Sequence, residues 1–354
     1  MNHALRLEAL GGAIGAPLLV SKAANMRYLT GFTGSSGWML VKPGGPATFV
    51  TDGRYGELAA ELVNVLPDTD LVVYTSGMWE VFRSLVDGLD GVHLEADDVT
   101  WEFSEDFAKE TGIEVTPGSG AVEEMRRTKD ADEVAALQAA ADAGDNAFLA
   151  LAQIAVPTLS EEELGWRLID EMRKAGGQAA GWDPIVAAGA GASIPHYRSG
   201  RNPLGDGLLL LDYGCTVEGY HSDMSRTVWL ADEPDAVMER VYRAVAESQE
   251  AGLAAVAPGV TCGAVDEAAR EVLRGYGYEE QFVHSTGHGV GLEIHEPPWV
   301  RAGNDDALKP GDVVTVEPGV YLPGVGGVRI EDMVLVTDSG SMVLTRSSKE
   351  PRAS

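Results

Sequence analysis

Apolar and polar residues alternate along the first third of the chain in a pattern of short strands and longer helices. Apolar runs of strand length occur at 17–20, 38–41, 48–51 and 71–74. Between them, 56–66 and 78–88 have the apolar spacing of helices. This alternation predicts an α/β domain in which helices flank a mixed sheet.

The pattern changes after this region. The segment EVTPGSG (114–120) is expected to interrupt regular structure, and EEMRRTKD (123–130) is expected to connect two domains. Helix starts are predicted where Asp130 precedes Glu133 and Ser160 precedes Glu163, because both pairs have the spacing of a capping box. The first helix should extend towards Ile154.

Further helices are predicted over 235–256 and after Thr261. Strands alternate with these helices, so the second domain is expected to be α+β with its site on one sheet face. The predicted limits are 1–122 for the first domain, 123–130 for the linker, 131–346 for the second domain and 347–354 for a flexible tail.

Two glycine-containing turns in the second domain are each flanked by a pair of acidic residues. In LDYGCTVEGYHSDMSRT, a hairpin centred near Val217 and Glu218 would place Asp212 directly opposite Asp223. Their Cβ atoms would then be about 4.5–5.5 Å apart on one face. In VVTVEPGVYLPGVGGVRIEDMVL, a turn about Gly324 would similarly oppose two glutamates, at 317 and 331.

Opposed carboxylates repel one another unless a cation lies between them. Together with one imidazole they make a suitable ligand set for two divalent ions, and the nitrogen favours Mn, Co or Zn over an all-oxygen site. The predicted metal ligands are Asp212, Asp223, His288, Glu317 and Glu331.

Histidines gather in the same part of the sequence. Five of the seven lie there, at positions 196, 221, 284, 288 and 295. An imidazole beside a metal can act as a ligand or transfer protons, because its ordinary pKa is about 6.5. His3 and His93, outside this region, are read as structural, and the role of His221 is left open.

Composition narrows the classes of protein. The chain has 354 residues, 45% of them hydrophobic, which is enough for two domains with substantial cores. Its net charge of −29 argues against nucleic acid or an anionic membrane as a partner. No apolar run reaches the length of a membrane helix, no signal peptide is recognised, and two cysteines fit a reducing compartment.

Several motifs carry a resemblance to a known family. The segments LDYG, GYHSDMSRT, HSTGHGVGLEIHEPP, VEPGVY and GVRIED resemble the metal-dependent proline peptidases of the pita-bread fold. That family includes Xaa-Pro dipeptidase (prolidase) and aminopeptidase P, with methionine aminopeptidase as a more distant relative. The stretches SKAANMRYLTGFTGSSGWMLV and FVTDGRY are similar to the N-terminal domain of the proline peptidases, so the resemblance covers almost the whole chain.

The resemblance implies a role for each candidate residue. Asp212 would chelate one ion, Asp223 and Glu331 would bridge two, and His288 would complete one coordination shell. Glu317 would ligate the ion that carries the attacking water, and would accept that water's proton. The second-shell and catalytic candidates are His196, His284 and His295, with Tyr321 and Arg329 beside the glutamates. Cys215 stands where the resemblance leads us to expect a small residue.

The implied activity is hydrolysis of the Xaa-Pro bond by a metal-activated bridging water or hydroxide. His295 and His196 would steady the oxyanion, and His284 would help to protonate the departing proline nitrogen. The implied cofactors are two divalent ions per subunit, with Mn favoured and Zn or Co as alternatives. The implied partner is a proline-containing di- or oligopeptide, and the implied form is a cytoplasmic homodimer.

Three function classes remain at this stage. The first is a proline-specific metallopeptidase, either a dipeptidase, favoured by the short N-terminal domain, or an aminopeptidase P. The second is a metal-free hydrolase on the same fold, like creatinase, and the third is a peptide-binding module without activity. Retention of all five candidate ligands favours the first class.

Overall fold

The computed structural model describes residues 1–118, 120–230 and 236–352. The chain divides into two compact units, an N-terminal unit (Met1–Arg126) and a C-terminal unit (Arg127–Ser354). Among the helices in the described residues, none combines the length and the apolar character needed to cross a bilayer.

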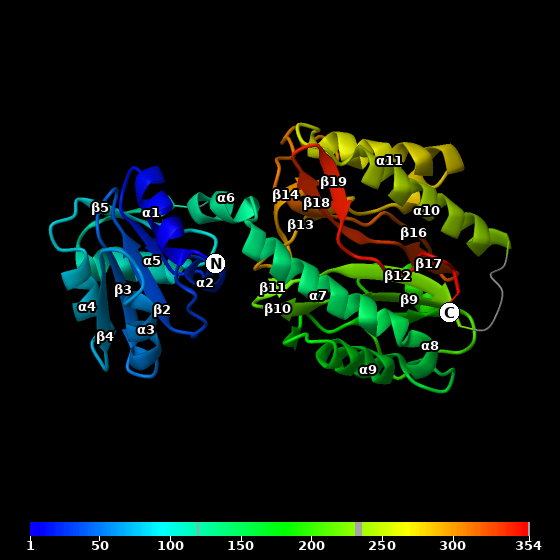
Figure 1. The fold of residues 1–354 in the computed structure, drawn as a ribbon, viewed down its shortest axis with the longest axis horizontal. Helices are drawn as coiled ribbons and strands as arrows, with labels where there is room; N and C mark the ends of the chain where they lie inside the picture. The colour runs from blue at the N-terminus through cyan, green and yellow to red at the C-terminus, as the bar shows by residue number, and fades with distance from the viewer. Residues whose placement is uncertain (119, 231–235, 353–354) are drawn as a thin grey trace. The chain divides into compact units, whose positions relative to one another are not determined.

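The N-terminal unit is a sheet flanked by helices, as the sequence predicts (Figure 1). Its elements are α1 (His3–Ala13), β1 (Leu18–Val20), α2 (Ala23–Thr30), β2 (Gly37–Val41), β3 (Ala47–Asp52), α3 (Gly56–Val63), β4 (Thr69–Tyr74), α4 (Met78–Leu85), β5 (Gly91–Glu95), α5 (Trp101–Thr111), β6 (Glu114–Gly118) and α6 (Ala121–Arg127). The strand order is β4-β3-β2-β1-β5-β6, with both parallel and antiparallel pairs. The four predicted strands and two predicted helices are confirmed.

The expected break at EVTPGSG is wrong for residues 114–118, which form β6 and pair in parallel with β5. Pro117 lies within this strand. Because β6 is at the edge of the sheet, proline's missing N–H removes no bond from an inner ladder. The expected connector at 123–130 includes the end of α6, which is helical to Arg127.

The C-terminal unit contains several small sheets between helices. Its elements are α7 (Ala131–Leu149), α8 (Leu151–Ile154), α9 (Glu161–Lys174), β7 (Ala179–Ala180), β8 (Ile185–Ala188), the 3₁₀ turn η1 (Gly189–Ser193), β9 (Leu208–Tyr213), β10 (Cys215–Val217), β11 (Tyr220–His221), β12 (Met224–Trp229), α10 (Ala236–Ala255), α11 (Cys262–Tyr276), the 3₁₀ turn η2 (Glu279–Gln281), β13 (Gly287–Gly289), β14 (Glu296–Val300), β15 (Val313–Val316), β16 (Gly319–Leu322), β17 (Gly326–Arg329), β18 (Asp332–Thr337) and β19 (Gly340–Val343).

Helices cover the strands of this unit from two sides. In Figure 1, α7 and α9 lie on one side of β9 and β12, and α10 and α11 lie on the other. One apolar core joins α7 and α9 to Leu209 and Leu211, and a second joins α10 to Leu208 and Leu210. The continuous apolar run at 208–211 therefore belongs to a strand that is buried on both faces.

Both predicted capping boxes are present. The Asp130 side chain accepts from the backbone of Glu133 at the start of α7, and Ser160 pairs in the same way with Glu163 at the start of α9. Thr261 caps α11. The predicted start of α10 at Asp235 lies outside the described residues.

The first acidic hairpin is shifted from its predicted register. Its turn residues are Glu218 and Gly219, both with positive φ (49° and 75°), rather than Val217 and Glu218. Asp212 therefore pairs with Ser225, and the prediction that it directly opposes Asp223 is wrong. Since side chains alternate with a period of two, this two-residue shift leaves both aspartates on the same face.

The second acidic hairpin has the predicted register. Gly319 pairs with Arg329 in one ladder, and Val316 pairs with Asp332 in the next. Glu317 and Glu331 lie between these ladders in the same register, so they occupy opposed positions.

The described end of the chain is packed, in contrast to the flexible tail expected from residue 347. Ser347 donates through its backbone N–H and its hydroxyl to Asp145, at 2.8 and 2.5 Å. Lys349 donates to Gln249 at 2.8 Å. Charged and polar side chains from distant helices hold these residues, which the polar composition of the segment does not reveal.

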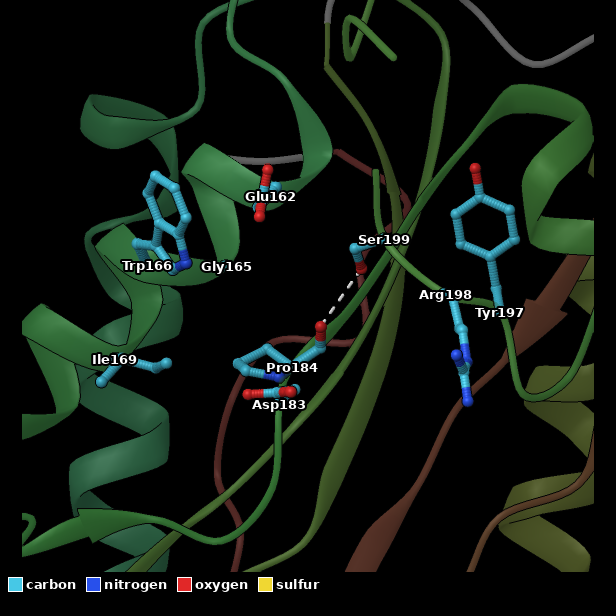
Figure 2. Close-up of a pocket in the computed structure, with 9 residues that line it drawn as sticks. All are labelled: Glu162, Gly165, Trp166, Ile169, Asp183, Pro184, Tyr197, Arg198 and Ser199. Atoms are coloured by element: carbon cyan, nitrogen blue, oxygen red, sulfur yellow. Dashed lines mark hydrogen bonds between the residues drawn. The ribbon is translucent and has the colours of Figure 1, made fainter. Parts of the chain in front are cut away.

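A loop without regular structure follows η1 and leads to β9. A cavity of about 520 Å³ separates part of this loop from α9 (Figure 2). Ser199 closes one wall, because its hydroxyl donates to the Pro184 carbonyl and accepts from the Val186 amide. Figure 2 shows Trp166 and Ile169 on the opposite, helical wall.

Candidate metal centre

The C-terminal unit contains a cavity of about 570 Å³ in which most of the predicted site residues meet. The predicted site residues that line this cavity are Asp212, Asp223, Glu317, Glu331, Arg329, His196, His284, His288 and His295. They come from β9, β13, β17 and the ends of β12, β15 and β18, or from the loops beside them. Strands distant in sequence therefore bring the motifs together.

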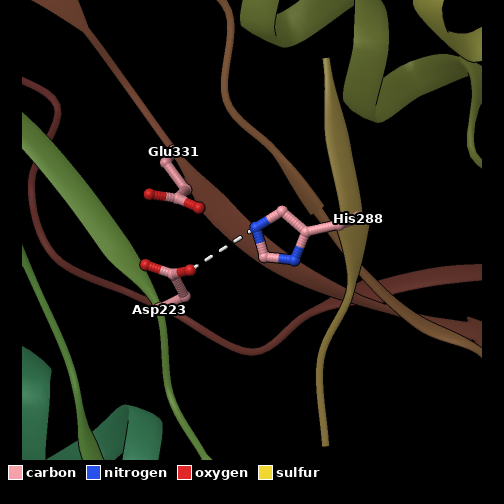
Figure 3. Close-up of side chains that lie close together, drawn as sticks. All are labelled: Asp223, His288 and Glu331. Atoms are coloured by element: carbon pink, nitrogen blue, oxygen red, sulfur yellow. Dashed lines mark ion pairs between the residues drawn. The ribbon is translucent and has the colours of Figure 1, made fainter. Parts of the chain in front are cut away.

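Three of the predicted ligands lie close enough to share one ion. Donor atoms of Asp223, His288 and Glu331 are all within 4.8 Å of one another, and the three side chains are buried. Figure 3 shows the two carboxylates facing the same edge of the imidazole ring. Nε2 of His288 is 3.6 Å from Oδ2 of Asp223.

The local backbone sets the orientation of His288. Its Nδ1 lies 3.0 Å from the carbonyl oxygen of Gly289. A carbonyl can only accept, so Nδ1 carries a proton and Nε2 is the nitrogen turned towards the carboxylates. This is the arrangement expected of an imidazole that ligates through Nε2.

The remaining two carboxylates adjoin this group. Oε1 of Glu317 is 3.4 Å from Nε2 of His288. Oδ2 of Asp212 accepts from Arg329 at 2.6 Å. Since a carboxylate has two oxygens, this ion pair leaves Oδ1 of Asp212 for another partner.

Arg329 organises the opposite side of the centre. Besides Asp212, it donates to the Tyr321 hydroxyl at 2.8 Å and to the Ser225 hydroxyl at 2.8 Å. Ser225 in turn donates to Oε2 of Glu331 at 2.8 Å. The guanidinium therefore fixes two carboxylates, one directly and one through a hydroxyl.

The acidic side chains differ in their ionisation. Burial, reinforced by the neighbouring carboxylates, raises the pKa of Asp223 and of Glu331 well above the ordinary range. Burial acts in the same direction on Glu317, but the hydrogen bond from His288 and the charges of His288, His284 and Arg329 together outweigh it and lower the pKa of Glu317 to about 2. Burial disfavours the charged form of His288, but Glu317 outweighs it and raises the pKa of the ring.

These features fit a divalent cation. Oε1 of Glu331 is buried and, within the described part of the chain, has no hydrogen-bond partner. An unpaired buried carboxylate oxygen is costly, and crowded carboxylates repel one another, so a cation at this position would relieve both effects. The oxygen and imidazole donors match the preferences of Mn, Co or Zn.

The other predicted histidines lie around this group. The rings of His295 and His288 are 4.4 Å apart between centroids. His284 contacts the Tyr321 hydroxyl through Nε2 at 2.9 Å. Tyr321 does not line the cavity itself, but it connects His284 to Arg329. His196 lies on the loop after η1 and is exposed.

Buried charged residues hold the segments that carry His284 and His295. Arg270 donates to the His284 carbonyl at 2.6 Å and pairs with the buried Asp266. Lys129 pairs with Glu296, the residue after His295, at 2.8 Å. These charged residues therefore have a structural role, because they hold the backbone at or beside His284 and His295.

Sequence reasoning missed Ser225, which bonds to Arg329 and Glu331 beside the cavity. It is two positions after Asp223 on the same strand face, so strand alternation was a signal for it. The apolar walls come from Trp182, Ile185, Ile294 and Trp299, of which only Ile294 lies in a motif identified in the sequence. His221 does not line this cavity, and its ring contacts the Gly291 carbonyl.

Cys215 is fully buried, and burial raises the pKa of its thiol. A buried neutral thiol is a poor nucleophile and reacts slowly with oxidants. The surroundings of Cys215 therefore favour a packing role for this residue over a reactive one.

Comparison with known proteins assigns the chain to a family. Residues 135–338 match the model of metallopeptidase family M24, and residues 14–128 match the creatinase/prolidase N-terminal domain. The chain belongs to metallopeptidase family M24. It is therefore a metal-dependent peptidase, and the M24 family implies divalent metal ions.

Similar proteins match this M24 chain over nearly its whole length. The Xaa-Pro dipeptidase of Pyrococcus horikoshii is 30% identical over 335 residues, covering 94% of this chain and 93% of the relative. The structure of an Xaa-Pro dipeptidase from Bacillus anthracis has 34% identity and a TM-score of 0.93, covering 99% and 98% of the two chains. An X-Pro aminopeptidase structure from Thermotoga maritima has 32% identity and a TM-score of 0.87, covering 98% and 99%.

The family match confirms the predicted fold class, an α/β N-terminal domain followed by a pita-bread catalytic domain of the M24 type. Among the three function classes left by the sequence, it favours the metallopeptidase over the metal-free hydrolase and the inactive binding module.

Proposed function

We propose that this chain hydrolyses the Xaa-Pro peptide bond, acting as an Xaa-Pro dipeptidase. The observation that carries the proposal is the convergence of four carboxylates and one imidazole on a single cavity of an M24 chain. Relatives that match it from end to end support the substrate class, because they include Xaa-Pro dipeptidases.

The proposed ligands are the five predicted residues, and the proposed cofactors are two ions per subunit. Asp223 and Glu331 would be shared, with Asp212 on one side and His288 and Glu317 on the other. Mn is the favoured metal, with Zn or Co as alternatives. Ions held there supply a Lewis acid for the peptide carbonyl and a source of hydroxide near neutral pH.

The protein's own groups complete the reaction. Glu317, ionised as a proposed metal ligand, would take a proton from the attacking water. Burial and the neighbouring His288 lower the pKa of His295, so its neutral ring can donate one hydrogen bond to the developing oxyanion. We propose the same role for His196, because it lines the same cavity. Such a donor typically contributes about 3–4 kcal/mol to transition-state stabilisation.

His284 is proposed to help protonate the leaving proline nitrogen. Its Nδ1 lies 2.8 Å from the Ser285 carbonyl, and its Nε2 contacts Tyr321. Burial lowers its pKa, so the ring must receive a proton before it gives one. The Tyr321 hydroxyl, which accepts from Arg329, contacts Nε2 of His284. This contact would have to be shared or broken when Nε2 gives a proton to the leaving nitrogen.

Aminopeptidase P activity is the second candidate. The similar structure from Thermotoga maritima is an X-Pro aminopeptidase. With this activity, the chain would release the first residue from Xaa-Pro-Yaa peptides. Both candidates use the same metal centre, so they differ in substrate length rather than in the ligand set.

Three broader features belong to the same proposal. The catalytic domain would comprise 131–346, preceded by a domain at 1–122 and a linker at 123–130. We infer that the protein acts as a homodimer in the cytoplasm.

The substitution Asp223→Ala tests the ligand assignment. It removes a shared carboxylate, so at least one ion should be lost and turnover should fall below detection. Metal content measured by mass spectrometry and hydrolysis of Leu-Pro are the two readouts. Asp206→Ala, at an exposed aspartate, is the matched control. A metal-replete, fully active Asp223→Ala protein would remove Asp223 from the ligand set.

A further inference from the structure

His196 is the least restrained of the proposed catalytic groups. Its side chain is exposed, and the loop that carries it has no regular structure. Within the described ranges, no hydrogen bond to the His196 ring is found. The position of the ring therefore depends on the backbone on either side of it.

On one side of His196 the carbonyl of Pro195 accepts from Arg329 at 3.4 Å. On the other side, the Tyr197 side chain and the Gly200 backbone converge on one buried carboxylate, Glu161, at the first position of α9. Its side chain is 1% exposed. Oε2 accepts from the Tyr197 hydroxyl at 3.0 Å and from the Gly200 amide at 3.0 Å. Oε1 accepts from the Ala188 amide, also at 3.0 Å. Glu161 thus holds the residue immediately after His196 and the end of β8.

Further bonds join the same helix start to the loop. Asn202 donates to Oε2 of Glu161 at 3.4 Å and to the Tyr197 hydroxyl at 3.0 Å. The backbone N–H of Glu161 donates to the Asn202 carbonyl at 3.0 Å. The loop is therefore fixed at several points within a few residues of His196.

The chemistry of these contacts requires a carboxylate. All four side-chain partners of Glu161 are donors, and an ionised carboxylate is the side chain that offers only acceptors. Its place in the first turn of α9 also suits a negative charge, because the helix N-terminus carries partial positive charge. A glutamine would turn an NH₂ group towards one of these donors.

Glu161 lines neither the metal cavity nor the cavity shown in Figure 2. Tyr197 and Ser199, from the loop that carries His196, line the cavity in Figure 2. Both segments that Glu161 links nevertheless reach the metal cavity, β8 through Ile185 and the loop through Pro195 and His196. It is therefore placed to set their separation without touching a substrate.

We propose that Glu161 is a positioning residue for His196, and that it acts by holding Tyr197, Gly200 and Ala188 in place. The inference rests on the proposed function, because it assumes that His196 contributes to Xaa-Pro hydrolysis. A displacement of about 1 Å in a catalytic group can lower the rate about 10²-fold. Loss of the Glu161 contacts should therefore affect activity through His196.

The test compares Glu161→Gln with Glu162→Gln, which makes the same change one residue away. Metal-loaded enzymes are assayed for kcat and KM on Leu-Pro, and on Leu-Pro-Gly if the wild type prefers the longer peptide. Glu161→Gln should lower kcat/KM by about 10- to 100-fold, mainly in kcat. Glu162→Gln should match the wild type, and both should retain the wild-type metal content.

A double-mutant cycle shows whether the effect passes through His196. In a His196→Ala background, adding Glu161→Gln should cause less than about a twofold further loss. Multiplied losses would mean that Glu161 acts independently of His196, and would overturn the proposal. A fully active His196→Ala or Glu161→Gln enzyme would overturn it as well.

Two further measurements keep the test decisive. Hydrogen exchange over 186–203 should be faster in Glu161→Gln, because glutamine keeps only one side-chain oxygen and either the Ala188 or the Gly200 amide loses its acceptor. If Glu161→Gln does not fold, Tyr197→Phe removes one of the same bonds and should show a smaller loss that again disappears without His196. Unchanged exchange contradicts the proposal. A wild-type protein inactive on both peptides would instead contradict the proposed function.

Discussion

Asp223 and Glu331 make the metal-free protein sensitive to pH. Burial and mutual repulsion raise both pKa values in the folded chain, so the folded state binds protons more readily than the unfolded state does. Their contribution to stability is therefore present at low pH. It is lost as pH rises from the unfolded pKa of about 4 through the raised folded values.

A divalent cation should reverse this loss, because it binds the ionised carboxylates and competes with protons. We predict that adding Mn²⁺ to chelator-stripped protein raises the Tm more at about pH 7.5 than at about pH 5.5. Differential scanning calorimetry at both pH values provides the measurement. An equal gain in Tm at both would show that these carboxylates do not bind the metal as anions.

A substitution at His295 can distinguish an effect on catalysis from an effect on metal binding. The His295 ring packs against the ligand His288, but no metal contact is assigned to it. We predict that His295→Ala lowers kcat by about 10²- to 10³-fold, the usual effect of losing an oxyanion donor, while metal content stays near that of the wild type. If metal is lost in proportion to activity, His295 is a ligand or a support of the fold.

Residues of the site differ in how well sequence predicts them. The ligand candidates stand in motifs where acidic and imidazole groups have no simple structural use, so their chemistry is visible locally. Glu161 and Trp182 act through contacts that exist only after distant segments meet. The sequence therefore indicates the metal chemistry, but not what shapes the cavity or positions His196.

At the scale of elements, the close approach of β13 to β15 places His288. A Cβ at Gly287 would lie 2.0 Å from the Thr315 carbonyl oxygen, and the Thr315 hydroxyl accepts from the His288 amide. Gly287 is therefore needed for the two strands to lie at this distance.

We predict that Gly287→Ala destabilises the protein by about 1–3 kcal/mol, as overpacking typically does, and weakens metal binding by displacing His288. Urea unfolding and metal titration measure the two effects. Gly275→Ala is the matched control in α11, where a Cβ meets nothing within 4 Å. It should be neutral or stabilise by up to about 1 kcal/mol. Wild-type behaviour of Gly287→Ala would mean that the strands separate without cost.

Elements with local sequence signals were predicted, whereas strand β6 and the register of the first acidic hairpin, which depend on pairing, were not. Both capping boxes are complete within four residues, so sequence alone identifies them. Strand β6 contains a proline and becomes a strand through its pairing with β5 at the sheet edge. The register error at Asp212 and Asp223 has a similar origin, because the residues that take positive φ fix the turn.

At the scale of the whole molecule, the sequence predicted two domains of the correct classes, and the family match agrees over 14–128 and 135–338. The net charge of −29 argues against nucleic acid and anionic membranes as partners, but it does not identify a substrate. We expect substrate length to depend on the loops around the cavity. The choice between dipeptidase and aminopeptidase therefore requires a measurement.

The most direct measurement is paired hydrolysis of Leu-Pro and Leu-Pro-Gly by chelator-stripped protein, with and without added Mn²⁺. We predict no activity without metal, and cleavage of Leu-Pro when Mn²⁺ is restored. Release of leucine from Leu-Pro-Gly alone would retain the metal centre but make the protein an aminopeptidase P. Cleavage of neither peptide by the metal-loaded protein would contradict Xaa-Pro hydrolysis.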